Sequence, residues 1–351
     1  MIRGSRKRMM IFKKNKIVLF FLLIASSAFA QQDLYLTLNN NRARPVALGG
    51  AYSSIEDNIV SATYNPASLN LYQREKSFRV TFFFNPITPT ILFSEEGKTQ
   101  NNQDYESDNR RYLKNAATLI KSIVFTAKFL DLGFIFNEQL INRNELQTQQ
   151  VFFKNSDLFS NCYHTVIARI KLADRVSIGA SANMYLKKNT VETERFYGFN
   201  YGILVKPSPK LNVGITYHYF PKTFSDARME LERLADQTIN AGISYFPFKN
   251  STLAVDLRNL TEEKGKSTFE AHFGFEQRLF SLIAFRAGFF NERPSNHPMV
   301  SAGIGLIDSN LLFSKENQFS QPDFMLNYTF AQKKESGQVY NWHLISVVLR
   351  F

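Results

Sequence analysis

The stretch VSIGASANMYLK, from Val176 to Lys187, alternates between apolar and polar or small side chains. Successive residues of a β-strand point to opposite faces, so this period of two predicts a strand with one apolar and one polar face. The stretch is longer than the five or six residues usual in soluble sheets, and it matches the length of a tilted strand that crosses a bilayer. We therefore interpret it as one strand of an all-β transmembrane antiparallel barrel.

The same period recurs along most of the chain and predicts about fourteen strands. Short turns at Ala173-Asp174, Pro207–Lys210, Phe248–Asn250, Phe280–Leu282 and Asp308–Asn310 alternate with longer polar loops around 141–161, 188–194, 221–236, 261–267, 291–298 and 332–340. Tight periplasmic turns and longer outer loops are typical of outer-membrane barrels. The expected strands are 78–96, 121–128, 131–140, 162–172, 175–187, 195–206, 211–220, 238–247, 251–260, 268–278, 282–290, 299–307, 311–331 and 341–351.

The first thirty residues have the features of a secretory signal peptide. A basic stretch that ends at Lys16 precedes the apolar run IVLFFLLIASSAFA, from Ile17 to Ala30, whose last residues fit the A-x-A cleavage pattern. Export and an even number of strands predict a bacterial (Gram-negative) outer-membrane protein with both termini on the periplasmic side. The single cysteine, Cys162, excludes an intrachain disulfide framework.

The net charge gives little support to a nucleic-acid partner. The formal charge is +12, but seven basic residues and no acidic ones lie in the first thirty residues, so the mature chain carries about +5. A nucleic-acid partner requires a concentrated basic face. We interpret the remaining charge as ordinary solvated surface.

We predict that residues 31–76 form a plug in the lumen and that residues 77–351 form the barrel. A closed barrel of about fourteen strands is too wide for its inward side chains alone to fill. Ile55, Ile59 and Ala62 have helical spacing, and Ser53 with Glu56 three residues later has the pattern of a capping box. One short helix that starts near Ser53 is the expectation.

Two further local signals lie in the same segment. Gly49-Gly50 allows a tight bend or a close approach of the backbone to a neighbour. Asn65 before Pro66 has the pattern of an N-cap followed by proline at the first helical position, which predicts a second short helical turn through Ala67 and Leu69.

The ordered pattern R-x-x-A-L-G-G-A-Y, D-N, A-T-Y-N-P-A-S-L, from Arg44 to Leu69, resembles the N-terminal region of the long-chain fatty-acid transporter (FadL-like) barrels. It looks closer still to their PorV/PorQ-type relatives. The later stretches YGILVKPSPKLNVGITYHY and TINAGISYFPFKNSTLAVDLRNL look like the paired hairpins of that family. The positions that carry the match are Ala47, Leu48, Gly49, Gly50, Ala51, Asp57, Ala62, Asn65, Pro66, Ala67 and Leu69.

The resemblance implies a fourteen-stranded barrel with an N-terminal hatch in its lumen. In the FadL-like transporters it implies passage of hydrophobic or amphipathic small molecules, gated by the hatch. In PorV-type members it implies instead a role in type IX protein secretion, with a protein partner at the membrane. Both functions stay open at this point, although the chain is shorter than typical fatty-acid transporters, which weakens the case for a deep capture groove. The residues that would form the gate are Ala47, Leu48, Gly49, Gly50, Asp57, Asn65, Pro66, Ala67 and Leu69.

The sequence does not predict an enzyme, a metal site or a cofactor. Its five histidines have no metal-ligand spacing, and no G-x-S-x-G, Walker or dinucleotide pattern occurs. His343 and Ser346 fall on opposite faces of one strand, so they do not form a Ser-His pair.

Polar residues on the inward faces of the strands are the candidates for lining the lumen. Charged side chains are costly toward lipid and natural in a polar lumen. Arg278 or Arg286 could hold a carboxylate head group, but lumenal ion pairs that brace the barrel or the plug are the commoner arrangement. The candidates are Asn183, Tyr185, Asn200, His218, Glu270, His272, Glu276, Arg278 and Arg286.

The final stretch NWHLISVVLRF ends on Phe351. An apolar alternating strand with a C-terminal aromatic resembles the signal by which the outer-membrane assembly machinery recognises barrels. The expected partners are therefore outer-membrane lipid and that machinery, together with a hydrophobic small-molecule substrate or secretion-system proteins. The sequence identifies neither the substrate nor the direction of transport.

Overall fold

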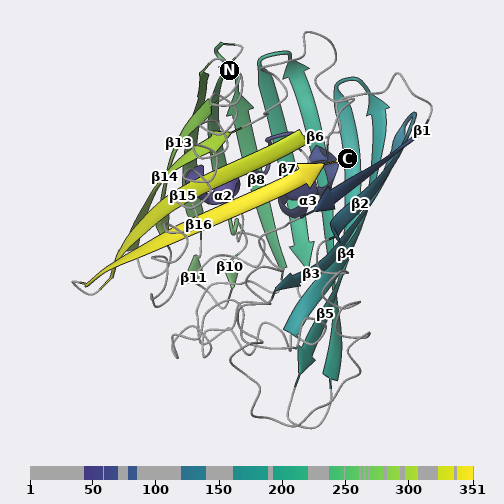
Figure 1. Ribbon diagram of the computed structural model, residues 1–351, viewed down its shortest axis with the longest axis horizontal. Helices are drawn as coiled ribbons and strands as arrows, with labels where there is room; N and C mark the ends of the chain where they lie inside the picture. The colour runs from purple at the N-terminus through teal and green to yellow at the C-terminus, as the bar shows by residue number, and fades with distance from the viewer. Residues whose placement is uncertain are drawn as a thin grey trace, which may run out of the picture.

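A computed structural model of the chain describes residues 43–57, 59–69, 78–84, 120–139, 161–188, 193–219, 237–248, 250–260, 262–263, 266–267, 269–279, 283–292, 297–306, 323–335 and 338–350. Fourteen strands form one antiparallel sheet, and its last strand, β16, also pairs with its first, β1, so that the sheet is a closed barrel (Figure 1). The closing pairs are Phe83 with Arg350 and Phe84 with Leu349.

The barrel strands are β1 (Phe78–Phe84), β2 (Ile120–Ala127), β3 (Leu130–Gln139), β4 (Asn161–Ala173), β5 (Val176–Lys188), β6 (Thr193–Ser208), β7 (Leu211–Tyr219), β8 (Gln237–Tyr245), β9 (Ser251–Arg258), β12 (Glu270–Leu279), β13 (Ile283–Glu292), β14 (His297–Leu306), β15 (Asp323–Glu335) and β16 (Gln338–Arg350). Each strand pairs with the barrel strand before it and the one after it. The short strands β10 (Glu262–Glu263) and β11 (Lys266–Ser267) form a separate hairpin between β9 and β12.

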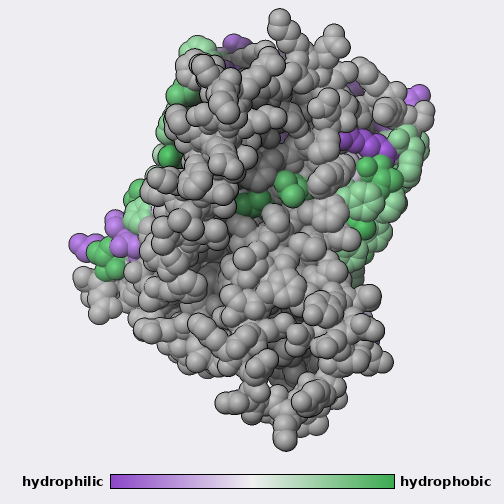
Figure 2. All heavy atoms as spheres, in the orientation of Figure 1, coloured by the Kyte–Doolittle hydropathy of each residue, from purple (hydrophilic) through white to green (hydrophobic). Residues whose placement is uncertain are grey.

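The barrel is apolar outside and largely polar inside, with apolar inward residues gathered on β1 to β4. In β7, Asn212, Thr216 and His218 are buried on the inward face, whereas the side chain of Ile215 points outward and is 52% exposed. The same alternation exposes large apolar residues on neighbouring strands, and Figure 2 shows hydrophobic residues over the flank where β1, β2 and β4 lie. Further exposed members include Val166, Ile178, Ile203, Ile243, Leu253, Phe273, Phe285, Val300 and Ile304.

The predicted number of strands is confirmed, and most predicted bounds agree with the structure within about two residues. The predicted loop 332–340 is wrong, because β15 and β16 continue as a tight hairpin in which Glu335 pairs with Gln338. Backbone hydrogen bonds extend these strands through polar residues, and a reading of side-chain hydropathy does not detect them. The predicted strand segments 85–96 and 311–322, the turn at 308–310 and the terminal Phe351 lie outside the described residues.

The N-terminal residues from Ala43 to Leu69, here called the inner segment, lie inside the barrel. Figure 1 shows its helices α2 (Ala43–Ala47) and α3 (Ile59–Tyr64) surrounded by the strands, and a one-turn 3-10 helix, η1 (Pro66–Ser68), follows them. Of its described residues, Arg44, Glu56 and Asp57 are half-buried and the others are buried. No helix among the residues described is long and apolar enough to cross a membrane.

The expected capping box at Ser53 and Glu56 is wrong, since α3 begins only at Ile59. The backbone N–H of Ser53 donates instead to Asp256 on β9, and the carboxylate of Glu56 pairs with Arg169 and Lys206. Long-range charged partners thus take the groups that a local cap would have used. The Asn65 cap is confirmed: its side chain accepts a 3.0 Å hydrogen bond from the N–H of Ala67, with Pro66 at the first helical position.

Gly49 and Gly50 form the expected tight bend, with φ angles of +60° and +79°. This left-handed region is open to glycine at little cost and is disfavoured for other residues. Space is equally restrictive at Gly49, because a Cβ atom there would lie 2.6 Å from the backbone nitrogen of Phe289 and 2.8 Å from the carbonyl oxygen of Phe273. The bend therefore depends on glycine for both conformation and clearance.

We expect Gly49→Ala to destabilise the barrel by about 2 kcal/mol or more, since backbone strain of ~1–2 kcal/mol adds to the steric conflict. Urea-induced unfolding in detergent micelles, followed by circular dichroism, measures the change. Gly133→Ala is the matched control, because the one close approach of its Cβ would be to the flexible end of Ile59, at 3.0 Å, while Ile167 would lie at an ordinary contact distance of 3.6 Å. Equal midpoints for the two variants would contradict the assigned role of the bend.

Candidate functional site

The candidate functional site is the contact between the inner segment and the inward faces of the barrel strands. The helices of the segment are short, so many of its backbone groups lack hydrogen-bond partners within the segment. These groups and its few charged side chains need partners from the barrel wall. The strands supply them at inward positions, which recur every second residue. Three groups of contacts follow along the segment, at Arg44, at the Gly49-Gly50 bend and at Asn65–Ala67.

Arg44 on α2 joins the segment to β12 through Glu276. Its Nε and Nη2 atoms donate to the two carboxylate oxygens of Glu276 at 2.9 and 3.0 Å. The same carboxylate accepts from Nε of Arg286 at 2.6 Å and from Nε of Arg278 at 3.0 Å. Three arginines therefore surround one fully buried carboxylate, and a second acid, Asp57, also pairs with Arg44.

Nearby carboxylates raise the pKa of Arg44, and burial raises that of Tyr52. Burial alone lowers the pKa of Arg44, but the carboxylates of Asp57 and Glu276 hold it well above its usual range. Burial raises the pKa of Tyr52, against the opposing effect of the Arg44 cation. Arg44 therefore stays charged and Tyr52 neutral, so that the Tyr52 hydroxyl donates a 2.6 Å hydrogen bond to Asp57.

The Gly49-Gly50 bend is held at both ends by side chains of β9 and β12. The Nδ1 atom of His272 lies 2.6 Å from the carbonyl oxygen of Gly49, and Arg258 donates to the carbonyl of Gly50. One carboxylate oxygen of Asp256 accepts from the backbone N–H groups of Tyr52 and Ser53, each at 2.8 Å. Adjacent barrel strands thus bond to the carbonyls of the bend and to the amides that follow it.

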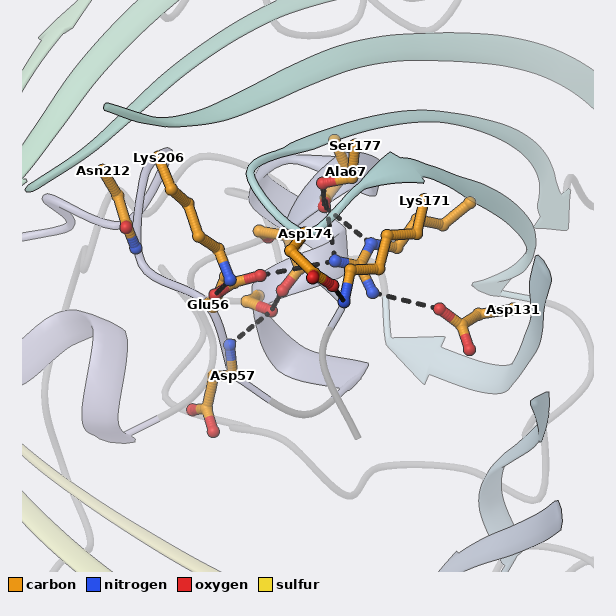
Figure 3. A network of polar contacts seen from close by, with 12 residues as sticks. Glu56, Asp57, Ala67, Asp131, Lys171, Asp174, Ser177, Lys206 and Asn212 are labelled. Atoms are coloured by element: carbon orange, nitrogen blue, oxygen red, sulfur yellow. Dashed lines mark hydrogen bonds and ion pairs between the residues drawn. The ribbon is translucent and has the colours of Figure 1, made fainter. Parts of the chain in front are cut away.

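The third group holds η1 against β4, β5 and β6 (Figure 3). The carbonyl oxygen of Ala67 accepts from Nε of Arg169 at 3.0 Å and from Oγ of Ser177 at 2.9 Å. Arg169 also pairs with Asp131 at 3.0 Å and with Glu56 at 3.3 Å, while Lys206 pairs with Glu56.

Asn65 completes this attachment. Its Nδ2 donates 2.8 Å to the carbonyl of Ser53, within the segment, and 3.3 Å to the carbonyl of Ile203 on β6. The side chain fits because Gly202 faces it: a Cβ on Gly202 would collide with the Asn65 amide. One asparagine therefore caps η1 and ties two parts of the segment to the wall.

Other candidates from the sequence bond to neighbouring wall residues, and His218 also bonds to the backbone of Tyr64 in the inner segment. Oδ1 of Asn200 lies 3.0 Å from Nδ1 of His218, and Nδ2 of Asn200 donates to Ser181. Asn183 accepts a 2.7 Å hydrogen bond from Thr165, and Glu270 lies 3.1 Å from Nε2 of His272. The side chain of Tyr185 lies outside the described residues.

The two arginines considered for a carboxylate ligand differ in their surroundings. Arg286 is buried, with Nε on Glu276 and Nη1 donating 2.9 Å to Asn327. The side chain of Arg278 is 38% exposed. Both belong to an ion-pair cluster that braces the inner segment, the commoner of the two arrangements considered from the sequence.

Sequence analysis did not select Asp131, Arg169, Asp256 and Arg258, nor Arg44 beyond its place in the pattern. A usable signal was present, because Asp256 and Arg258 occupy the same phase of STLAVDLR as the buried Ala254, opposite to the exposed Leu253 and Val255. A charge in the inward phase of an otherwise apolar strand predicts a lumenal partner. The identity of that partner could not be read from the chain.

Apolar contacts complete the packing of the inner segment. One cluster joins Ile59, Ala62 and Leu69 to inward residues of β1 to β4, namely Phe83, Val124, Ile135 and Ile167. A second cluster lies mostly within the segment and reaches the wall at Ala254. Within the described part of the chain, no group of three or more His, Cys, Asp or Glu side chains could hold a metal ion.

Comparison with family models and with curated proteins gives no match. Among solved structures, the chain is similar to the monoaromatic hydrocarbon channel CymD, with 13% identity and a TM-score of 0.49 over 90% of this chain and 98% of that chain. The toluene transporter TbuX of Ralstonia pickettii has 10% identity and a TM-score of 0.46 over the same shares of both chains. A mutant Rh. blastica porin has 8% identity and a TM-score of 0.36 over 66% and 75% of the two chains. Similarities of this size assign the chain to no family.

We expect Glu276→Gln to destabilise the protein by about 3–5 kcal/mol, because it leaves three arginine side chains without their shared counter-charge. Urea unfolding in micelles measures the loss. Asp174→Asn is the matched control: Asp174 pairs with Lys171 at 2.8 Å but its side chain is 96% exposed, so we expect a change of at most ~1 kcal/mol. If the two variants unfolded alike, Glu276 would not be a principal anchor of the segment.

Proposed function

We propose that the protein is an outer-membrane β-barrel that passes hydrophobic or amphipathic small molecules, with the inner segment as its gate. One observation carries the proposal: a fourteen-stranded barrel, apolar on its outer face, encloses its own N-terminal segment on a polar inner face. A lipid environment is the setting in which such an inside-out distribution is stable. The signal peptide and the terminal strand predicted from the sequence agree with this location.

The packing of the interior supports hydrophobic rather than aqueous passage. Porins keep a water-filled lumen, whereas the described inner segment here is buried against the strands all the way from α2 to η1. Where its contacts are apolar, as around Ile59 and Leu69, an apolar molecule can replace protein contacts of the same kind. The resemblance of Arg44–Leu69 to the FadL-like hatch points the same way.

A fatty-acid-like substrate is supported by the cluster around Glu276. It carries three arginines against two carboxylates, Glu276 and Asp57, so its formal charge is positive. Arg278 is the exposed member, and a guanidinium binds a carboxylate well. We infer that Arg278, rather than the enclosed Arg286, gives a carboxylate head group a transient contact during passage.

Uptake of labelled dodecane, dodecanol and dodecanoic acid tests the proposal in Gram-negative cells that lack their own uptake route. Cells that produce the full chain should accumulate at least one probe several-fold faster than cells with an unrelated barrel, and a small sugar should enter no faster. Equal rates for every probe would eliminate the transport function.

A second candidate is a component of type IX protein secretion that binds a protein partner at the membrane, as the resemblance to PorV/PorQ-type barrels suggests. The observation in its favour is the tight filling of the interior, where Leu48, Ala51, Tyr52 and Leu69 are completely buried. A strain that lacks the protein distinguishes secretion from transport. If less secreted protein reaches its cell surface while its uptake of hydrophobic probes stays normal, the secretion function is favoured.

Membrane location gives a separate prediction for the outer face. We expect Ile215→Arg to destabilise the barrel in lipid bilayers by about 2–4 kcal/mol, since a cation would face hydrocarbon. Asp174→Arg in the exposed turn between β4 and β5 is the control and should have little effect. Equal stability of both variants in vesicles would argue against a lipid-facing β7.

A further inference from the structure

The inner segment is attached differently on its two sides. Toward β4–β9, β12 and β15, charged and polar side chains bond to it directly, through Arg169, Asn212, Asp256, His272 and Thr329 among others. These bonds are directional and buried, so breaking them leaves unpaired charges and backbone groups. We therefore expect this side of the inner segment to stay attached to the wall.

Toward β1–β3 the segment makes an apolar contact. Ile59 and Ala62 of α3, with Leu69, pack against Phe83 of β1, Val124 of β2 and Ile135 of β3. Ile59 lies over Gly133, so its side chain reaches the backbone of β3. Apolar contact is non-directional, and an apolar ligand can take the place of one partner without leaving a polar group unpaired.

Unpartnered hydroxyl groups line the same wall. Thr81 of β1 and Ser122 of β2 are both 0% exposed, and among the described residues neither hydroxyl has a hydrogen-bond partner. Register places them in the apolar cluster, since Thr81 pairs with Val124 and Phe83 pairs with Ser122. Thr126, further along β2, has a buried hydroxyl in the same state. Buried unpartnered polar groups are few in native proteins, and each calls for an explanation.

We propose that the contact between α3 with Leu69 and the inward face of β1–β3, here called the α3–β1 site, binds the transported molecule. It would take an apolar chain that carries one hydroxyl or carboxyl group. The chain replaces the contacts of Ile59, Ala62 and Leu69 with the wall, and the head group bonds to the hydroxyls of Thr81 and Ser122. The polar side of the inner segment remains attached during passage. The inference rests on the proposed transport function and specifies its route.

The double variant Thr81→Val/Ser122→Ala tests the hydroxyls. Both replacements are close in shape to the originals and remove no hydrogen bond within the described protein, so the barrel should fold. Retention of radiolabelled dodecanol and dodecanoic acid by the purified full chain in micelles should fall about tenfold, and retention of dodecane should stay within twofold. Ser301→Ala is the matched control, because its hydroxyl on β14 is likewise buried and unpartnered but lies on a different wall.

A disulfide lock tests the stationary side. The hydroxyl oxygens of Ser54 and Ser244 lie 2.6 Å apart, so Ser54→Cys/Ser244→Cys in a Cys162→Ser background should form a disulfide that ties the segment to β8. Uptake by oxidised cells should remain within twofold of uptake by reduced cells. If oxidation abolished uptake and reduction restored it, the segment would have to leave the wall as a whole, and the inference would be wrong.

The outcomes separate this inference from the function on which it rests. If the unmodified protein retains and takes up none of the three probes, the transport function itself fails. If it retains them and the double variant does so equally, transport stands and the α3–β1 site is wrong. An equal fall in the retention of dodecane and of dodecanol would also contradict the α3–β1 site, because the hydroxyls of Thr81 and Ser122 would then not bind the head group.

Discussion

The interior of the barrel has to be filled, and this constraint governs the rest of the structure. Fourteen strands enclose more space than their own inward side chains occupy. The chain meets the constraint with its N-terminal segment, which contains only short helices and therefore many backbone groups without helical partners. Those groups determine which residues must stand on the inward faces of the strands.

Charged residues of the barrel wall each bind a particular group of the inner segment. Asp256 accepts hydrogen bonds from the amides that follow the Gly49-Gly50 bend, and Arg169 donates to the carbonyl of Ala67 in η1. Arg44 brings a cation into the barrel, and Glu276 pairs with it as well as with two wall arginines. Because buried charges are costly unless they are paired and hydrogen-bonded, these contacts fix one position of the segment.

The distribution of polar and apolar contacts around the inner segment bears on its function. Moving the whole segment out of the barrel would break its charged contacts with the wall, whereas Ile59, Ala62 and Leu69 contact β1–β3 through apolar side chains. In the proposed transport function, passage of hydrophobic molecules along that contact would leave the charged clusters paired. A filled interior would then be compatible with passage through it.

Much of this architecture could be predicted from the sequence, because it depends on local patterns. Alternation in stretches such as Val176–Lys187 determined the strands and their inward faces, and Asn65-Pro66 and Gly49-Gly50 determined a cap and a bend. Only the tertiary structure decided the start of α3, the continuous hairpin of β15 with β16, and the partners of Glu56, Asp256 and Glu276. The physical reason is range: strand period and helix caps arise between neighbours in the chain, whereas Arg44 and Glu276 are 232 residues apart and meet only when the barrel surrounds its own N-terminal segment.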